Sequence, residues 1–585
     1  MKENPNLAGF DMVLGLSQTT INYQFKKLYQ NDFIQDKWFA LVGNVLNPKE
    51  GEKPFHLAGA DDELKSKIDR WIALQHDVEE AKKSEDWAAF GQLMNTIKTE
   101  GLNFDYAWDA DLKAPSIEII DKDPRNLYFN LSFEDGKLYY RPESTSAVKV
   151  FDLSGSVYAF TTPIGRIKIN KDQMVMEADE AMDSLIRNSG LSEADFRIES
   201  LFLNLENANI SDFDKNRSKF PEDATLPLQI AVESYFNLML KGAENPYVLG
   251  YGVTQPDVKS SEAMFQPTSL AFSSSYSSKQ NTSKPIKGQF SALNFLMMLN
   301  KEDAPTGPTA GIMPASVIEL GKDTSSTTDG VFAIDRGHFD QYIDSLDAYV
   351  VSVFKEKKDV SIESDGFQVK DGKPTMVAKS HMSGGELGDD KIDTTYTLVR
   401  KPLKNVDQGL EVEYEFHVSI KVHLIAKVFV EIELKQIDLS TSGQYSYKDV
   451  KGPGKVGSMK FLIKNGKEGR FDLENSLDPP TIAFDESVYL FEGGALKVFL
   501  NILKLVLAWP ILIVEGIINQ IAIDLGNKDV TKENESIQKL RELDVLNQTN
   551  KVILPLGKTY AYKNLRAIED KSLIVYDITY APVTE

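Results

Sequence analysis

The sequence predicts an α+β protein in which long, curved antiparallel sheets wrap round long helices. One observation is a segment of alternating apolar and polar residues, Leu410–Leu434, that is much longer than an ordinary strand. A second is a segment near the C-terminus, Ala495–Leu525, that is apolar round most of a helical circumference. We call these the alternating segment and the apolar segment. Each requires a long apolar partner, and each fits the other.

In the alternating segment every even position is apolar and most odd positions are polar, with Ile425 and Phe429 as the exceptions. This alternation is typical of a strand with one buried face. No Gly, Pro, Asn or Asp interrupts the segment, so nothing signals a turn. At about 3.3 Å per residue a single strand would extend roughly 80 Å. We therefore expect one long strand that curves along an elongated molecule.

The apolar segment is too interrupted for a transmembrane helix. Its longest stretch without charged or amide side chains is Leu505–Val514, whereas a membrane span needs about 20 apolar residues. On a helical wheel its polar residues fall on one narrow stripe, and Pro510 is expected to kink the helix. We therefore expect a buried helix that is held by other elements on several sides.

The rest of the chain mixes helical and strand patterns. We expect a first strand over Phe10–Leu16, followed by a helix capped by Thr19 or Thr20. Two helices with dense charge on one face lie within 61–98 and form a hairpin inserted between strands. The other expected elements are strands between Ser116 and Ile169, including a hairpin over Tyr128–Tyr140 that turns at Asp135-Gly136, a strand over Leu201–Leu205, and helices over Leu228–Leu240 and Phe339–Phe354.

Residues 267–288 are rich in serine and contain Pro285 and Gly288, which is typical of a linker. A chain of 585 residues is long enough for two modules, each with its own core. We therefore predict an N-terminal module over 1–266, with the helical hairpin as an insertion, and a C-terminal module over 289–585.

The composition narrows the classes of partner. The net charge is −22, and so acidic a surface repels phosphate backbones, which makes nucleic acid an unfavourable partner. The absence of cysteine excludes disulfides, thiolate metal sites and a cysteine nucleophile. The first residues, MKENPNLAGF, contain no apolar core of a Sec signal peptide. We expect a soluble protein that is cytoplasmic or released by another route.

Motifs for catalysis or metal binding are missing from the sequence. GxSxG, HExxH, GxGxxG and a complete Walker A motif do not occur. His417 and His423 would lie about 20 Å apart on one strand, too far to ligate one metal ion. Asp109-x-Asp111 and Asp121-x-Asp123 lack the remaining ligands of a calcium loop and fit turns. We therefore expect no enzyme activity, no catalytic residue, no metal and no cofactor.

Several short stretches resemble one family, in order along the chain. They are Gly9–Phe25, Glu233–Val253, Phe265–Ser273, Ser291–Leu299, Asp329–Phe339, Leu554–Asn564 and Leu573–Tyr580. These stretches are similar to the P47-like bacterial proteins known from clostridial neurotoxin gene clusters, which belong to the tubular lipid-binding (TULIP) superfamily. The resemblance implies TULIP-type modules, a lipid or fatty-acid-like ligand in an apolar tunnel, and partner proteins from a toxin cluster. It does not cover 61–98, and it implies no catalytic residue.

The two long segments provide the candidate lining of such a tunnel. The candidates are Phe499, Leu503, Val506, Leu507, Ile511 and Val514 on the apolar segment, and Phe416, Val418, Ile420 and Val422 on the alternating segment. The same side chains also fit a plain core, which would make the protein a structural scaffold without a ligand. A long alternating strand also fits a pore-forming or membrane-inserting toxin component. The sequence leaves these three functions open.

Overall fold

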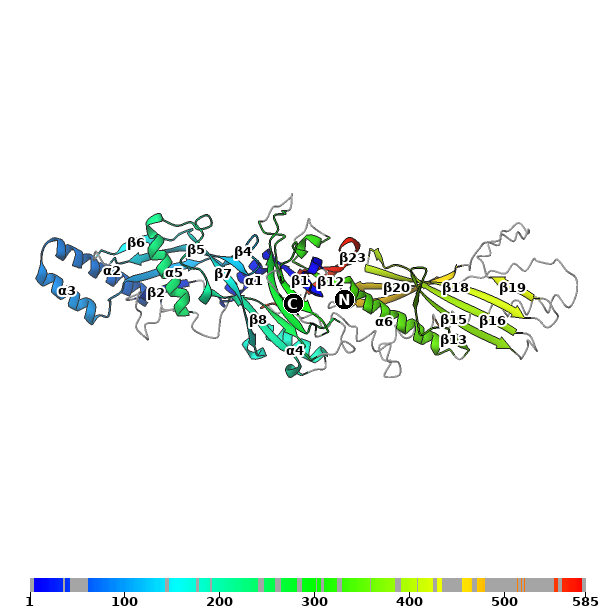
Figure 1. The fold of residues 1–585 in the computed structure, drawn as a ribbon. Helices are drawn as coiled ribbons and strands as arrows, with labels where there is room; N and C mark the ends of the chain where they lie inside the picture. The colour runs from blue at the N-terminus through cyan, green and yellow to red at the C-terminus, as the bar shows by residue number, and fades with distance from the viewer. Residues whose placement is uncertain are drawn as a thin grey trace.

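The chain has a mixed α+β fold with large curled antiparallel sheets and few helices, arranged as an elongated molecule (Figure 1). A computed structural model describes residues 5–34, 37–42, 61–142, 147–174, 178–189, 192–239, 247–257, 265–280, 287–300, 302, 304–306, 310–322, 329–357, 359–383, 391–407, 409–423, 429–433, 455–465, 471–478, 513, 517, 520, 552–555 and 560–580. In this part of the chain the strands form one 6-stranded and two 9-stranded sheets. No helix in it is long and apolar enough to cross a membrane.

The N-terminal sheet forms one end of the molecule. Its strands, in order, are β2 (Lys37–Val42), β3 (Tyr106–Leu112), β5 (Asn126–Tyr140), β7 (Val157–Ile169), β8 (Arg197–Leu203), β9 (Val248–Thr254) and β22 (Val552–Ile553), while β4 (Ser116–Ile119) and β6 (Lys149–Asp152) pair with β5. Helices α4 (Ala178–Ser189) and α5 (Thr225–Met239) lie beside this sheet. Between the paired strands β2 and β3 the chain forms α2 (Asp61–Lys83) and α3 (Trp87–Thr99), which confirms the predicted helical hairpin.

The central sheet joins distant parts of the chain. Its order is β10 (Ser269–Ser275), β11 (Ala292–Met298), β1 (Met12–Ser17), β12 (Gly330–Asp335), β24 (Leu573–Tyr580) and β23 (Tyr560–Ile568). The first strand therefore lies between two strands from beyond residue 289, so the sheet combines residues from both predicted modules. Helix α1 (Gln18–Gln30) leaves β1 directly, and its cap is Ser17 rather than Thr19 or Thr20, because the Thr20 N–H donates to Ser17 Oγ.

The linker predicted over 267–288 is wrong where β10 forms. All seven residues of β10 pair with β11, and Ser273, Ser274 and Ser275 are buried. Asn294 of β11 donates from Nδ2 to Ser273 Oγ at 3.3 Å and to Ser275 Oγ at 3.1 Å. Hydrogen bonds between neighbouring strands thus allow hydroxyl side chains to be buried. The serine-rich composition of this stretch therefore predicted a linker, although the stretch forms a strand.

The distal sheet forms the other end of the molecule, with α6 (Arg336–Lys355) lying along it (Figure 1). Its order is β13 (Val360–Ile362), β15 (Lys373–Ser383), β16 (Lys391–Arg400), β18 (Gly409–His423), β20 (Lys455–Asn465) and β21 (Phe471–Asp478); β14 (Gln368–Lys370) pairs with β15, and β17 (Lys404–Val406) and β19 (Phe429–Glu433) pair with β18.

The alternating segment is not one strand, so this prediction is wrong. It contains β18 and β19, which pair antiparallel from Ser419↔Glu433 to His423↔Phe429. In this register each even residue of β18 lies opposite an even residue of β19. The apolar positions therefore stay on one face through the reversal, and the alternation continues in the sequence. Period two alone cannot distinguish this hairpin from a single strand.

The hairpin predicted at Asp135-Gly136 is also wrong, because β5 continues through these residues. Gly136 has a φ of +131°, and a Cβ atom built on it would lie 2.4 Å from Ala110 Cα on β3. The register between β3 and β5 shifts at Asp111/Leu112, which marks a bulge. The glycine therefore permits an irregular, close strand pairing rather than a turn.

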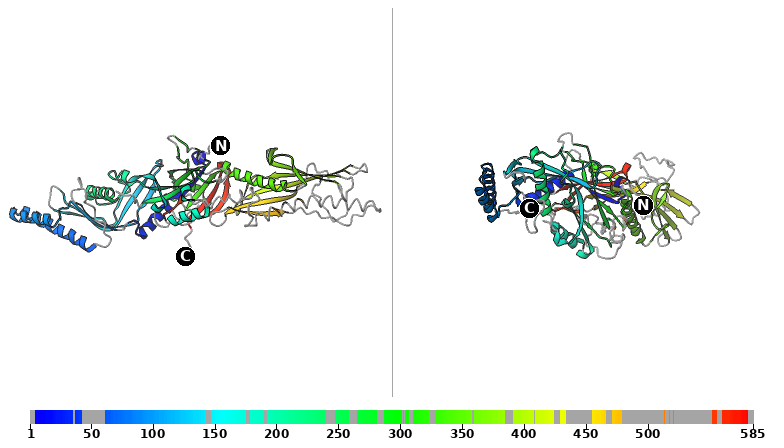
Figure 2. Two further views of the ribbon diagram at one scale, coloured as in Figure 1. Left: turned by 90° about the horizontal axis from the view of Figure 1, so that it is seen from below. Right: turned by 60° about the vertical axis from the view of Figure 1, so that its left-hand side comes forward.

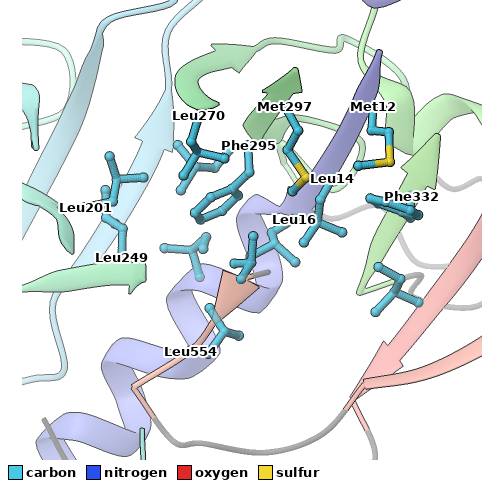
Figure 3. Packing of buried hydrophobic residues seen from close by; sticks show 14 of the residues in the cluster. Met12, Leu14, Leu16, Leu201, Leu249, Leu270, Phe295, Met297, Phe332 and Leu554 are labelled. Atoms are coloured by element: carbon cyan, nitrogen blue, oxygen red, sulfur yellow. The ribbon is translucent and has the colours of Figure 1, made fainter. Parts of the chain in front are cut away.

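One apolar cluster connects the three sheets. Figure 3 shows Leu201 and Leu249 of the N-terminal sheet in the same cluster as Leu14, Phe295 and Met297 of the central sheet. The cluster continues through α6 to buried residues of the distal sheet. A second, smaller cluster on the central sheet is separate from it.

Candidate functional site

The buried face of β18 is the described part of the candidate ligand site. Its members with described side chains are Leu410, Val412, Tyr414 and Phe416, each exposed by 1% or less. The neighbouring strands add buried apolar residues to the same cluster, namely Met376, Ala378, Tyr396, Leu398 and Ile463. Strand alternation thus collects these side chains on one side of the sheet.

Helix α6 packs against this face. Its Asp335 cap accepts a hydrogen bond from the Gly337 N–H at 2.8 Å. The Phe354 and Phe416 rings stack with their centroids 6.3 Å apart and an interplanar angle of 22°. The buried apolar residues of α6 recur at helical spacing: Phe339, Tyr342, Ile343, Leu346, Tyr349, Val350, Val351, Val353 and Phe354. The apolar partner that the described structure gives to β18 is therefore α6, a pairing that the sequence patterns do not indicate.

The apolar segment falls almost entirely outside the described residues. Only Ile513, Ile517 and Gln520 of it are described, and all three are helical. Ile517 is fully buried in the main cluster, and Ile513 packs against that cluster. The candidate residues Phe499, Leu503, Val506, Leu507, Ile511 and Val514 lie outside the described part, so their role as lining stays a prediction.

The candidates on β18 are placed by strand register. Phe416 is buried and contacts α6, as described above. Val418, Ile420 and Val422 pair with Tyr396, Thr394 and Ile392 of β16, respectively. On the opposite side of β18, Ile420 and Val422 pair with Ile432 and Val430 of β19. These three candidates therefore belong to the end of β18 where the hairpin forms.

A polar network lies inside the interface between α6 and the distal sheet. The Tyr414 hydroxyl donates to Asp347 Oδ1 at 2.5 Å, and Arg400 Nη1 lies 3.2 Å from Asp347 Oδ2. Asp344, which is largely exposed, lies 3.5 Å from the same Arg400 nitrogen. Burial raises the pKa of Asp347 to about 6, although Tyr414 and Arg400 oppose that rise. Burial also raises the pKa of Tyr414 above its ordinary value, and the adjacent Asp347 adds to the effect.

A second ionisable pair connects α6 to the central sheet. His338, in the first turn of α6, donates from Nε2 to Asp11 Oδ1 at 2.8 Å, and Asp11 Oδ2 accepts the Leu299 N–H at 2.7 Å. Burial lowers the pKa of His338, but the hydrogen bond and the negative charge of Asp11 outweigh it and hold the pKa above its ordinary value. The pair thus fixes the start of α6 against the strand that opens the chain.

Gln24 is an unusual polar residue in the main apolar cluster. It lies on α1 beside the buried residues Ile21, Phe25 and Leu28, and it is 1% exposed. Neither Oε1 nor Nε2 of its carboxamide has a hydrogen-bond partner among the residues that the structure describes. A buried polar group without a partner costs about 1–3 kcal/mol, so this side chain is poorly explained by packing alone.

The described residues offer no cluster of three or more His, Asp or Glu side chains that could hold a metal ion. His381 and Asp393 are bonded across β15 and β16 at 2.6 Å, but this pair is half exposed. The described site is therefore apolar, with a few buried polar groups.

Comparison with known proteins finds solved structures of similar fold whose sequence identity to this chain is very low. No family model and no curated protein matches this chain. Among solved structures it is similar to "Structure of P47 from Clostridium botulinum A2", with 10% identity, a TM-score of 0.40 and coverage of 98% of each chain. It is also similar to P47 of Clostridium botulinum E1, with 10% identity, a TM-score of 0.41 and coverage of 98% of this chain and 99% of that one.

A lipopolysaccharide binding protein is a further structural neighbour. The identity is again 10%, the TM-score is 0.25, and the match covers 98% of this chain and all of the other. At these identities and TM-scores the likenesses carry no argument about what this chain binds.

Sequence reasoning missed the polar residues of the site. Asp347 occupies a position of α6 that lies on the apolar side, four residues from both Ile343 and Val351. An acidic residue at such a position is a signal that could have been read from the sequence. The sequence gives less indication that Gln24 is buried, because glutamine is common on helices and its side chain is ordinarily exposed there.

Proposed function

We propose that the chain is a non-enzymatic binding protein of the P47-like, TULIP type that holds a lipid or another hydrophobic ligand. The observation that carries this proposal is the Gln24 carboxamide, which has no hydrogen-bond partner in the described part of the chain and lies inside an apolar cluster that spans the three sheets. The short stretches of sequence resemblance, spread in order between Gly9 and Tyr580, support it independently. In the proposal, the buried face of β18 and the apolar segment contribute to the lining in the distal part of the cluster, whereas Gln24 lies in another part of it, on α1, which is bonded to β4 of the N-terminal sheet.

The physical basis is the free energy of removing apolar surface from water. An acyl chain gains about 0.8 kcal/mol for each buried CH₂ group, so such a ligand needs few polar contacts. Its carboxylate, ester or hydroxyl group would need one hydrogen-bonding partner in the interior. The Gln24 carboxamide can both donate and accept a hydrogen bond, so it suits any of these groups.

Native mass spectrometry of the purified chain, combined with solvent extraction, tests this proposal. We expect a bound apolar molecule, or uptake of added fatty acid or phospholipid with one saturable site. A chain that is empty as purified and takes up neither class of lipid would overturn the proposal and favour a scaffold without a ligand.

A second candidate function is a pore-forming or membrane-inserting toxin component. The observation that favours it is the β18–β19 hairpin, in which apolar and polar residues alternate in phase on both strands. Release of a trapped dye from liposomes separates the two functions. Pore formation predicts rapid leakage, whereas simple ligand binding predicts none.

The family resemblance also leads us to propose an accessory role beside a toxin. The genes next to the one that encodes this chain test that role directly. Neighbouring toxin genes would support it, and a neighbourhood without any would contradict it.

A further inference from the structure

The outward face of α3 exposes a group of apolar side chains. Trp87 is 65% exposed and Met94 is 42% exposed. They are seven residues apart, so they lie on the same side of the helix, and Gly91 lies exposed between them. Figures 1 and 2 show α2 and α3 projecting at the extreme end of the molecule, where a broad flat partner can approach. We call Trp87, Ala88, Gly91 and Met94 the α3 patch.

The exposure of the α3 patch does not result from a poorly packed helix. The adjoining side of α3, one turn on from Met94, places Ile97, which is 2% exposed, in a local core with Trp71 and Val78 of α2. The Asp86 side chain caps the helix by accepting the Ala89 N–H at 3.0 Å. Trp87 itself is held edge-on against Phe90, with ring centroids 6.0 Å apart. A well-formed helix therefore presents a large aromatic ring to solvent.

The charges around the α3 patch favour a partner without net charge. Lys98 is the only charged residue within α3, although 26% of the chain is charged. The turn before the helix adds the exposed acidic residues Glu85 and Asp86, and Lys83 at the end of α2 is paired with Glu80 at 3.0 Å. Lys82 lies over the Phe90 ring, 5.7 Å from its centroid. Attraction to anionic lipids takes clusters of about 4–8 Lys or Arg, more than Lys82, Lys83 and Lys98 provide, and the net charge of −22 opposes it.

Zwitterionic choline lipids suit this arrangement. Tryptophan is enriched at the interface between water and the membrane. Aromatic faces bind quaternary ammonium groups, and the carboxylates beside Trp87 add a favourable charge for the same group. We propose that the α3 patch docks on the surface of a phosphatidylcholine bilayer, with Trp87 and Met94 at the level of the headgroups. This contact is separate from any ligand bound in the interior.

The absence of cysteine allows a clean test, because one introduced cysteine gives a single labelling site. Gly91→Cys places the label in the middle of the α3 patch, where an added Cβ meets nothing within 4 Å. Val369→Cys is the control, since Val369 is 77% exposed on β14 in the distal sheet, at the other end of the molecule. Each variant is labelled with an environment-sensitive fluorophore and mixed with phosphatidylcholine vesicles.

We expect the label at position 91 to brighten and shift to the blue with phosphatidylcholine vesicles, and the label at position 369 to stay unchanged. Replacing Trp87 and Met94 by serine in the Gly91→Cys chain should abolish the change. A response only to phosphatidylglycerol vesicles, an equal response at both positions, or no response would overturn the proposal. So would a response that depends on protein concentration without vesicles, because the occupant would then be a second copy of the chain.

Discussion

The Tyr414 hydroxyl donates a hydrogen bond of 2.5 Å to Asp347 Oδ1 between β18 and α6. Both residues are buried, and Arg400 of β16 approaches the same carboxylate at 3.2 Å. The three groups bring a helix and two strands together at one polar point within an apolar interface. Such a point fixes the position of α6 along the sheet more strictly than apolar packing does, because hydrogen bonds depend on direction.

Replacing Asp347 with Asn should change how stability depends on pH. The pKa of Asp347 is about 6 in the folded protein and 3.8 for an exposed aspartate. Between these values the folded state holds the proton more strongly, so rising pH costs the folded state free energy. At about 1.36 kcal/mol per pKa unit, the wild type should lose about 3 kcal/mol relative to Asp347→Asn. Urea unfolding at a series of pH values from below 3.8 to above 6 measures this difference.

Asp344→Asn is the matched control for this experiment. Asp344 lies on the same helix and near the same arginine, but its side chain is 68% exposed. We expect Asp344→Asn to keep most of the wild type's loss of stability with rising pH, because burial is the main cause of the raised pKa of Asp347 and the nearby charge of Asp344 adds least to it. A curve for Asp347→Asn that runs parallel to that of the wild type would show that burial does not shift the titration of Asp347.

Replacing Tyr414 with Phe should destabilise the protein above pH 7, where Asp347 is ionised. A hydrogen bond to a charged group is worth about 1.5–3 kcal/mol, and the variant leaves the carboxylate with fewer partners. Tyr396→Phe is the comparison, because its hydroxyl lies 3.2 Å from the neutral Ser380 Oγ on the same sheet. That variant should lose only about 0.5–1.5 kcal/mol. Equal losses in chemical denaturation would contradict a special role for the charged acceptor.

Some elements of this chain could be predicted from sequence patterns and others could not. The α2–α3 hairpin and α6 were predictable, because their apolar residues recur at helical spacing. The β18–β19 reversal was not, because both strands keep their even residues on one face. Strand β10 was missed because Asn294, distant in sequence from Ser273, provides the hydrogen bonds that allow serines to be buried. The missed strand therefore depended on a partner from another strand, and the missed reversal on the phase that β18 and β19 share.

The candidate site was predictable in part. The alternation identified Phe416 as facing an apolar partner, and its contact with Phe354 agrees with that expectation. The identity of the partner was not predictable, because α6 and the apolar segment are both helical patterns with wide apolar faces. Gln24 could not be recognised either, since only the packing of α1 shows that its carboxamide is buried without a partner among the described residues.

Replacing Gly136 with Ala should destabilise the N-terminal sheet. The residue has a φ of +131°, and its Cβ would lie 2.4 Å from Ala110 Cα. Backbone strain of this kind costs about 1–3 kcal/mol, and the close contact on β3 adds to it. Gly91→Ala is the opposite case, because an added Cβ on this helical glycine meets open space. Helix propensity predicts a gain of about 0.5–1 kcal/mol. Thermal unfolding of the two variants should therefore shift in opposite directions.

Replacing Gln24 with Leu tests whether the interior holds a ligand with a polar group. If the carboxamide binds such a group, Gln24→Leu should retain less ligand in native mass spectrometry and extraction. Gln18→Leu is the matched control on the same helix, because Gln18 Oε1 already accepts the Ile119 N–H at 2.8 Å. That variant should lose stability but keep its ligand. If Gln24→Leu instead gains about 1–3 kcal/mol by removing an unpaired polar group and its ligand content is unchanged, the carboxamide has no part in binding.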